Sequence, residues 1–234
     1  MSRLAIMQPY LFPYIGYFQL LNAVDQFIFY DDVNFIKQGW INRNKILLNG
    51  NEFIFTVPLK NASSFRLIKD IEVSERNFNN WKKSFFKTLQ TAYKKAPYFE
   101  AIFPILIEVF NSSNYISTLA INSIISCASY IGIGKPNFIS SDLCIDSNFS
   151  GKERVINICL QTKSSAYINA EGGVDLYNKS DFKNAGIELN FLKSNPIVYN
   201  QNQDKFISHL SIIDVLMYVK KSDISDLINA YKLF

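Results

Sequence analysis

The chain has 234 residues, of which 48% are hydrophobic and 15% aromatic, so it can bury a sizeable core in one large or two small domains. Its net charge of +4 suits anionic ligands such as phosphates without requiring nucleic acid. Three widely spaced cysteines, the lack of a CxxC pair and a single histidine argue against a zinc site and favour a reducing compartment.

No stretch approaches the roughly 18 apolar residues of a membrane span. The first apolar run turns polar at Gln8, which is too early for a signal peptide. We therefore expect a cytoplasmic protein without membrane contacts. There is no internal repeat or low-complexity linker, so residues 1–234 are predicted to form a single domain. The sequence does not specify an oligomeric state.

The first predicted unit alternates strand, helix and strand. Leu4–Met7 is a short apolar run typical of a buried strand, and the two prolines within residues 8–13 require a loop after it. Tyr14–Val24 is apolar almost all round, as in a helix buried against a sheet, and Gln26–Tyr30 is a second apolar strand. Such a unit implies parallel pairing, and ligands bind parallel sheets at the carboxyl ends of the strands.

The rest of the chain predicts a hairpin, several helices and further strands. Asn49-Gly50 separates the apolar runs Arg43–Leu48 and Glu52–Val57, which is a strong signal for an antiparallel hairpin. The predicted helices are Asn79–Ala96, Tyr98–Asn111, Ser117–Ile131, Lys152–Gln161, Ser180 to Gly186, Ser211–Val219 and Ile224–Tyr231. The further strands are Asn137–Ser140, Ala166–Asn169 and Ile187–Leu192. The predicted fold class is α/β: three layers, a mainly parallel sheet and a hairpin insertion.

Two loops at the expected carboxyl edge of the sheet carry many polar and aromatic groups. The first loop is stiffened by two prolines, so little entropy is lost when it is held in one shape. The residues predicted to bind substrate there are Gln8, Tyr10, Tyr14 and Gly16. The glycine allows close approach of a ligand or another backbone. The alternative is a packed loop with core aromatic side chains.

The second loop begins with two adjacent carboxylates. Asp31 and Asp32 are predicted to take a substrate amine, its proton or a cation. Lys37 and Arg43 supply positive charge, and arginine can grip a phosphate with two hydrogen bonds. Trp40 offers a stacking face for a base or a sugar. The alternative is a solvated loop whose charges are incidental.

Later segments add further candidates. His209 could deprotonate an amine, because imidazole exchanges protons near neutral pH; alternatively it bonds to a carboxylate or to backbone. Asp214 lies in an apolar stretch and needs a partner, so it either orients His209 or anchors the fold. The remaining residues predicted to bind substrate are Asn42, Asn169 and Gly173. The glycine pair that contains Gly173 matches no phosphate-loop motif and also fits a plain turn.

Several longer motifs occur along the chain. Those near the N-terminus are Gln8-Pro9-Tyr10, Phe12-Pro13-Tyr14-Ile15-Gly16-Tyr17, Tyr30-Asp31-Asp32-Val33 and Gly39-Trp40-Ile41-Asn42-Arg43-Asn44. Those further along are Ala96-Pro97-Tyr98-Phe99, Tyr167-Ile168-Asn169, Lys193-Ser194-Asn195-Pro196-Ile197 and His209 to Met217. Over essentially its whole length the chain resembles the WbqC-like proteins, which are found among genes for bacterial O-antigen and related surface polysaccharides. The resemblance implies a glycine transferase that acylates an amino sugar.

The first strand-helix-strand unit also resembles the nucleotide-binding fold of class I synthetases and adenylyltransferases. Those proteins carry a His-x-Gly-His-type motif at the start of the helix, whereas this chain has Tyr14-Ile15-Gly16-Tyr17 there. The imidazoles that stabilise an adenylating transition state are therefore missing. Glycine is then expected to arrive already activated, for example as glycyl-tRNA, in preference to activation by ATP.

The leading hypothesis is transfer of an acyl group, glycyl by resemblance, to the amine of a nucleotide-linked amino sugar. Its catalytic candidates are His209, Asp31 and Asp32, and no metal is predicted. The first alternative is a non-catalytic nucleotide-sugar or RNA-binding protein that serves a partner enzyme. The second is an ATP-dependent amide ligase.

Overall fold

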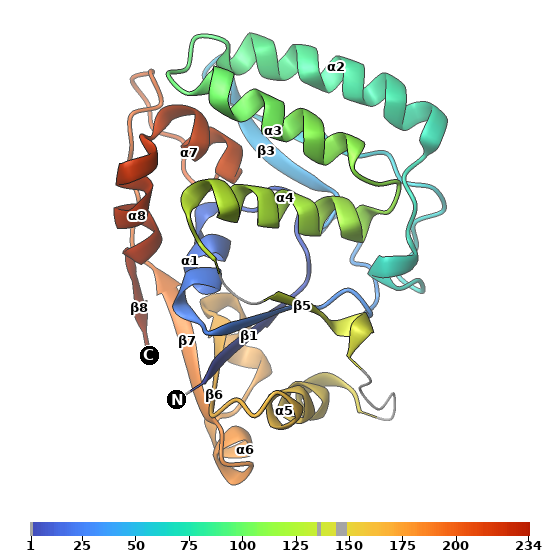
Figure 1. Cartoon of the computed structure of the whole chain (residues 1–234), viewed down its shortest axis with the longest axis vertical. Helices are drawn as coiled ribbons and strands as arrows, with labels where there is room; N and C mark the ends of the chain where they lie inside the picture. The colour runs from blue at the N-terminus through green and yellow to red at the C-terminus, as the bar shows by residue number, and fades with distance from the viewer. Residues whose placement is uncertain (1, 135–136, 144–148) are drawn as a thin grey trace.

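The computed structural model describes residues 2–134, 137–143 and 149–234, and its centre is a six-stranded sheet (Figure 1). The strands are β1 (Arg3–Met7), β2 (Gln26–Phe29), β5 (Asn137–Ile139), β6 (Ala166–Ala170), β7 (Glu188–Ser194) and β8 (Tyr231–Leu233). They lie in the order β5-β2-β1-β6-β7-β8, and all neighbours are parallel except β7 and β8. The five parallel strands thus follow the 3-2-1-4-5 order of doubly wound nucleotide-binding sheets.

Helices cover both faces of the sheet, which confirms the predicted α/β class. One face packs against α1 (Ile15–Ala23), α4 (Ile116–Ile131) and α8 (Lys221–Asn229), and the other packs against α5 (Gly151–Gln161) and α6 (Lys179–Asn184). Alternate residues of a strand point to opposite faces. Accordingly Leu4 and Ile6 belong to the cluster under α5 and α6, while Ala5 belongs to the cluster under α1.

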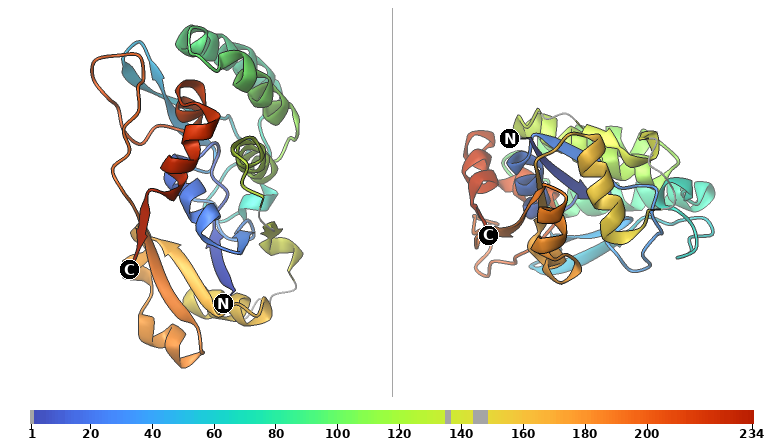
Figure 2. Two further views of the ribbon diagram at one scale, coloured as in Figure 1. Left: turned by 60° about the vertical axis from the view of Figure 1, so that its left-hand side comes forward. Right: turned by 90° about the horizontal axis from the view of Figure 1, so that it is seen from below.

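A second group of elements lies at the end of the molecule remote from α6 (Figure 2). It comprises the hairpin β3 (Arg43–Leu48) and β4 (Asn51–Thr56) with α2 (Glu75–Tyr93), α3 (Phe99–Asn111) and α7 (Ile212–Tyr218). Their aromatic rings pack closely: Phe55 lies 4.5 Å from Phe85, and Trp81 lies 4.9 Å from Phe85, between ring centroids. These residues belong to the same hydrophobic cluster as the α1 face of the sheet.

The predicted hairpin is confirmed, including its turn. Asn49 and Gly50 have φ values of 50° and 78°, as a two-residue turn matched to the twist of the strands requires. Short 3-10 helices that the sequence did not predict occur at η1 (Ile68–Asp70), η2 (Ser140–Asp142) and η3 (Glu171–Leu176). None of the helices in the described part of the chain is long and apolar enough to cross a membrane.

The predicted bounds of two helices are wrong at both ends: Asn79–Ala96 is observed as Glu75–Tyr93, and Ile224–Tyr231 as Lys221–Asn229. The helix predicted from Asn79 already begins at Glu75, because the buried Phe78 extends its apolar face by a turn. The last helix ends at Asn229, and Tyr231 starts strand β8 instead. The strand forms there because β7 would otherwise have an unpaired edge, and tertiary pairing overrides local helix preference.

Candidate ligand-binding site

A cavity of about 390 Å³ lies at the carboxyl edge of the sheet, and we call it the switch-point cavity. From β1 the chain proceeds to β2 on one side, and it later returns to β6 on the other side. The loops after β1 and β6 therefore diverge and leave a crevice, which is where doubly wound sheets bind ligands. Both loops line the cavity, through Tyr10 and Tyr14 on one side and Ala170 and Glu171 on the other.

Aromatic rings form much of the wall of the switch-point cavity. Tyr10, Tyr14 and Trp40 line it, and Tyr14 and Trp40 are 37% and 40% exposed. Arg43 lies over the Trp40 ring at 5.4 Å and donates from Nε to the Gly39 carbonyl at 3.2 Å, which fixes the indole edge of the site. Burial raises the pKa of both tyrosines above that of a free phenol, so their hydroxyls remain hydrogen-bond donors at neutral pH.

The loop after β1 is held in a strained conformation. Phe12 is fully buried and has a φ of 44°, in the left-handed region that bulky side chains avoid. Its N–H donates to Ser123 Oγ at 2.9 Å, and its carbonyl accepts from Asn44 Nδ2 and from Ser211 Oγ, each at 2.7 Å. Such strain persists only where the surroundings over-determine it, and it concentrates at functional sites. The loop is thus preorganised before any ligand binds.

Helix α1 begins at the cavity without a cap. Its N-cap residue Tyr14 makes no side-chain capping hydrogen bond, and its first turn contains no acidic residue. The first N–H groups of a helix have no acceptor within the helix, so they attract anions. Lys45 also lines the cavity, and its ammonium pairs with Glu52 at 2.6 Å. The start of α1 and Lys45 offer donors to a phosphate, and the Glu171 carboxylate, which also lines the cavity, pairs with Lys193 at 2.6 Å.

His209 lies at the mouth of the cavity, on the segment that leads from β7 to α7. Its imidazole meets the Tyr14 ring edge-on, with the ring centroids 6.1 Å apart. The residue is exposed, and its φ of 56° lies in the left-handed region. The next residue but one, Ser211, is fixed by a 2.8 Å hydrogen bond from its N–H to the Lys45 carbonyl. His209 is therefore presented to solvent and to the cavity from a fixed turn.

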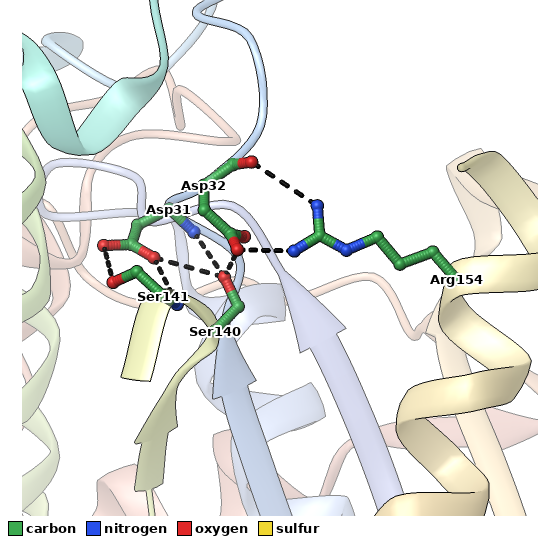
Figure 3. A network of polar contacts seen from close by, with 5 residues as sticks. All are labelled: Asp31, Asp32, Ser140, Ser141 and Arg154. Atoms are coloured by element: carbon green, nitrogen blue, oxygen red, sulfur yellow. Dashed lines mark hydrogen bonds and ion pairs between the residues drawn. The ribbon is translucent and has the colours of Figure 1, made fainter. Parts of the chain in front are cut away.

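The acidic pair lies elsewhere on the same edge of the sheet, after β2 (Figure 3). Asp31 accepts hydrogen bonds from Ser140 Oγ, from the Ser141 N–H and from Ser141 Oγ, all at 3.0–3.1 Å. Asp32 forms an ion pair with Arg154 of α5 and accepts from Ser140 Oγ. Burial raises the pKa of Asp31, partly offset by these hydrogen bonds. Neither aspartate lines the switch-point cavity.

Comparison with known proteins identifies the family of this chain. A model of the WbqC-like protein family matches residues 8–226. The chain belongs to the WbqC-like family. Uncharacterized protein Rv1507c of Mycobacterium tuberculosis is 26% identical to it over 222 residues, which cover 94% of each chain. No solved structure matches. The resemblance noted from the motifs is confirmed.

Of the residues predicted from sequence, this WbqC-like protein brings five together at the cavity. They are Tyr10, Tyr14, Gly16, Trp40 and His209. A Cβ on Gly16 would lie 2.3 Å from Cε2 of Tyr14, so the glycine is what allows that ring to lie against the start of α1.

The other predicted residues lie outside the lining. Asn42 is buried and donates to the Val57 carbonyl at 3.0 Å, while Lys37 is exposed. The Gln8 carbonyl accepts from Tyr17 Oη, and Gln8 Oε1 is buried without a protein partner. The Asn169 side chain packs against Gly173, because a Cβ added to this glycine would lie 2.2 Å from Asn169 Nδ2.

Sequence reasoning missed several residues of the cavity wall. Asn44, Lys45, Glu171 and Ser194 line the cavity. Asn44 could have been found, because an amide in an apolar strand requires a specific partner. Here its Nδ2 donates to the Leu11 and Phe12 carbonyls, which makes it an anchor of the loop after β1.

Replacing Arg154 with methionine should reveal a structural role for the acidic pair. The Arg154 and Asp32 side chains are 14% and 15% exposed, so the variant leaves a largely buried carboxylate without its ion pair. We expect the free energy of unfolding in urea to fall by about 2 kcal/mol. Lys152→Met is the control, because it removes an exposed ion pair from the same helix and should cause no measurable loss. Equal losses in the two variants would contradict the role.

Proposed function

We propose that this protein transfers an acyl group to the amine of a nucleotide-linked amino sugar bound in the switch-point cavity. The observation that carries the proposal is the meeting of three groups at one crevice. Aromatic rings can stack on a base or a sugar, the uncapped start of α1 can hold a diphosphate, and His209 can take a proton. The glycyl group that the family resemblance implies is the first acyl group to test.

The chemistry requires an uncharged amine and an activated acyl ester. The amine nitrogen attacks the carbonyl carbon, a C–N bond forms and the C–O bond to the carrier breaks. The proton lost by the amine passes to His209, and the carrier oxygen leaves as a hydroxyl after it takes up a proton. In this proposal Asp31 and Asp32 hold β2, β5 and α5 together, because their carboxylates already accept hydrogen bonds from this framework.

Mass spectrometry of amino-sugar nucleotides tests the proposal directly. UDP-glucosamine and related compounds would be incubated with the protein, glycine and a translation-competent extract. A mass gain of one glycyl residue that depends on the protein supports transfer. Binding of the nucleotide sugars without any gain across acyl donors would favour a binding protein that serves a partner enzyme. Pyrophosphate release that requires glycine and ATP but not tRNA would favour ligation instead.

Replacing Gly16 with alanine should separate binding from folding. Alanine is favoured over glycine in a helix by about 0.5–1 kcal/mol, and the three atoms nearest to the added Cβ all belong to the movable Tyr14 side chain. We therefore expect an unchanged or slightly raised melting temperature. The displaced ring leaves the cavity wall, so the affinity for UDP-glucosamine measured by calorimetry should fall about tenfold. Unchanged affinity would show that the position of Tyr14 does not matter for binding.

A further inference from the structure

A second cavity of about 450 Å³ adjoins the switch-point cavity, and we call it the apolar cavity. The two cavities share Tyr14, Ser194 and His209 in their walls. His209 and the Tyr14 ring therefore stand between them, and each cavity is open to the imidazole. A group transfer between two bound substrates needs this arrangement, with a proton acceptor at the boundary of the two sites.

The walls of the apolar cavity differ in chemistry from those of the first. They consist largely of branched aliphatic and aromatic side chains: Ile15, Ile197, Val198, Phe206, Leu210 and Val215. Of the two phenols there, Tyr14 is shared with the switch-point cavity, and Tyr199 already donates its hydroxyl proton to Asp214 at 2.7 Å. Few polar groups are left to read the edge of a base, and no lysine or arginine lines the cavity to hold a phosphate. The lining favours a hydrocarbon group.

The segment that forms the outer wall is anchored to the body of the protein. Gln201 is buried, and its Nε2 donates to the Ile207 carbonyl at 2.8 Å and to Asp214 Oδ2 at 3.0 Å. Its Oε1 accepts from the Ile207 N–H at 2.8 Å. Phe206 packs edge-on against Tyr199, with ring centroids 5.3 Å apart. The cavity is thus preformed, so little ordering entropy opposes binding.

We propose that the apolar cavity binds the hydrocarbon part of the acyl donor, an acyl group larger than glycyl. This inference rests on the proposed acyl transfer and narrows its donor. The carbonyl carbon would lie at the His209 boundary, the chain would lie among the aliphatic side chains, and the acceptor amine would approach from the switch-point cavity. A glycyl group has no side chain and would leave the apolar cavity empty.

Ligand-observed NMR titration of the full chain with acetamide, butanamide and hexanamide tests the inference without requiring turnover. Each added methylene should strengthen binding by about fourfold, because it is transferred from water to an apolar wall. Affinity that does not change along the series, or no binding of hexanamide, would overturn the apolar site.

Two variants locate the binding. Ser208→Trp places an indole at the exposed rim of the apolar cavity, and Ile197→Asp places a carboxylate in its wall. Both should weaken hexanamide binding at least tenfold and leave UDP-glucosamine binding unchanged. Lys205→Trp is the matched control, because it adds the same indole to an exposed position of the segment outside either lining. Hexanamide binding that survives in both variants would overturn the assignment.

The same titrations separate this inference from the proposed function. Loss of the amide series with UDP-glucosamine binding intact would remove the acyl site and leave the acceptor site standing. Failure to bind any nucleotide-linked amino sugar, with hexanamide binding intact and sensitive to Ser208→Trp, would instead overturn the proposed function. The acyl-binding cavity would then belong to another reaction.

Discussion

Replacing Asp214 with alanine should lower the free energy of unfolding by about 4 kcal/mol. The side chain is fully buried, and it accepts hydrogen bonds from Tyr93 Oη at 2.8 Å, from Tyr199 Oη at 2.7 Å and from Gln201 Nε2 at 3.0 Å. The alanine variant removes the acceptor that these three donors share. Urea unfolding gives the measurement, and Asp226→Ala on the exposed side of α8 is the control that should change little. Equal losses would contradict the anchoring role.

The same carboxylate should give stability a particular pH dependence. Burial raises the pKa of Asp214 in the folded chain, so the folded state binds more protons than the unfolded state between the two pKa values. The stabilisation that Asp214 provides is complete below its pKa in the unfolded chain, which is about 3.9. It is lost as the pH rises through its pKa in the folded chain. The stability of the wild type relative to Asp214→Asn should therefore decrease as the pH rises over this range. A difference that grows with pH would reverse the sign and exclude the explanation.

Replacing His209 with glycine should lower kcat for acyl transfer by about 10²–10⁴-fold. Glycine is the informative choice because the backbone there has a φ of 56°, which glycine adopts without strain. The imidazole is exposed, so the stability of the variant should not fall. UDP-glucosamine should still bind, because the aromatic walls and the start of α1 remain. The measurements are steady-state kinetics, calorimetry and thermal unfolding.

Added imidazole provides the control for His209→Gly. If His209 accepts the proton, free imidazole in the solvent should restore part of the lost rate, because the deleted ring leaves space at an open site. His209→Ala should show the same kinetic loss but a lower melting temperature than the glycine variant, since alanine is strained at this φ. Full activity in both variants would remove His209 from the mechanism.

Local patterns predicted most of the elements but could not give the strand order. The runs Leu4–Met7 and Gln26–Tyr30 showed two buried strands and a loop between a strand and a helix. β6 pairs with the edge of β1 that β2 leaves free, and this pairing depends on how the long connection between β2 and β6 folds. The pairing creates the crevice between the two diverging loops. Sequence reasoning therefore included Tyr10 and Tyr14, which line this crevice, but not Glu171.

The acidic pair shows why the partners of charged residues cannot be predicted from the sequence. Asp31 and Asp32 follow a strand at the carboxyl edge, as a ligand site requires, but their partners Ser140 and Arg154 are more than 100 residues away along the chain. No local pattern contains that information. His209 and Asp214 illustrate the same limit, because Asp214 bonds to Tyr93 and Tyr199 and does not contact the histidine through any of its hydrogen bonds.

The anchoring of Phe12 has a consequence for the order in which the cavity forms. The three side chains that hold its backbone, Asn44, Ser123 and Ser211, are separated from it by 32, 111 and 199 residues. During synthesis the first loop emerges early, but its anchor Ser211 is made 199 residues later. Contacts of such long sequence separation form late and slow folding. The wall that this loop contributes to the switch-point cavity is thus completed only after Ser211 has joined the fold.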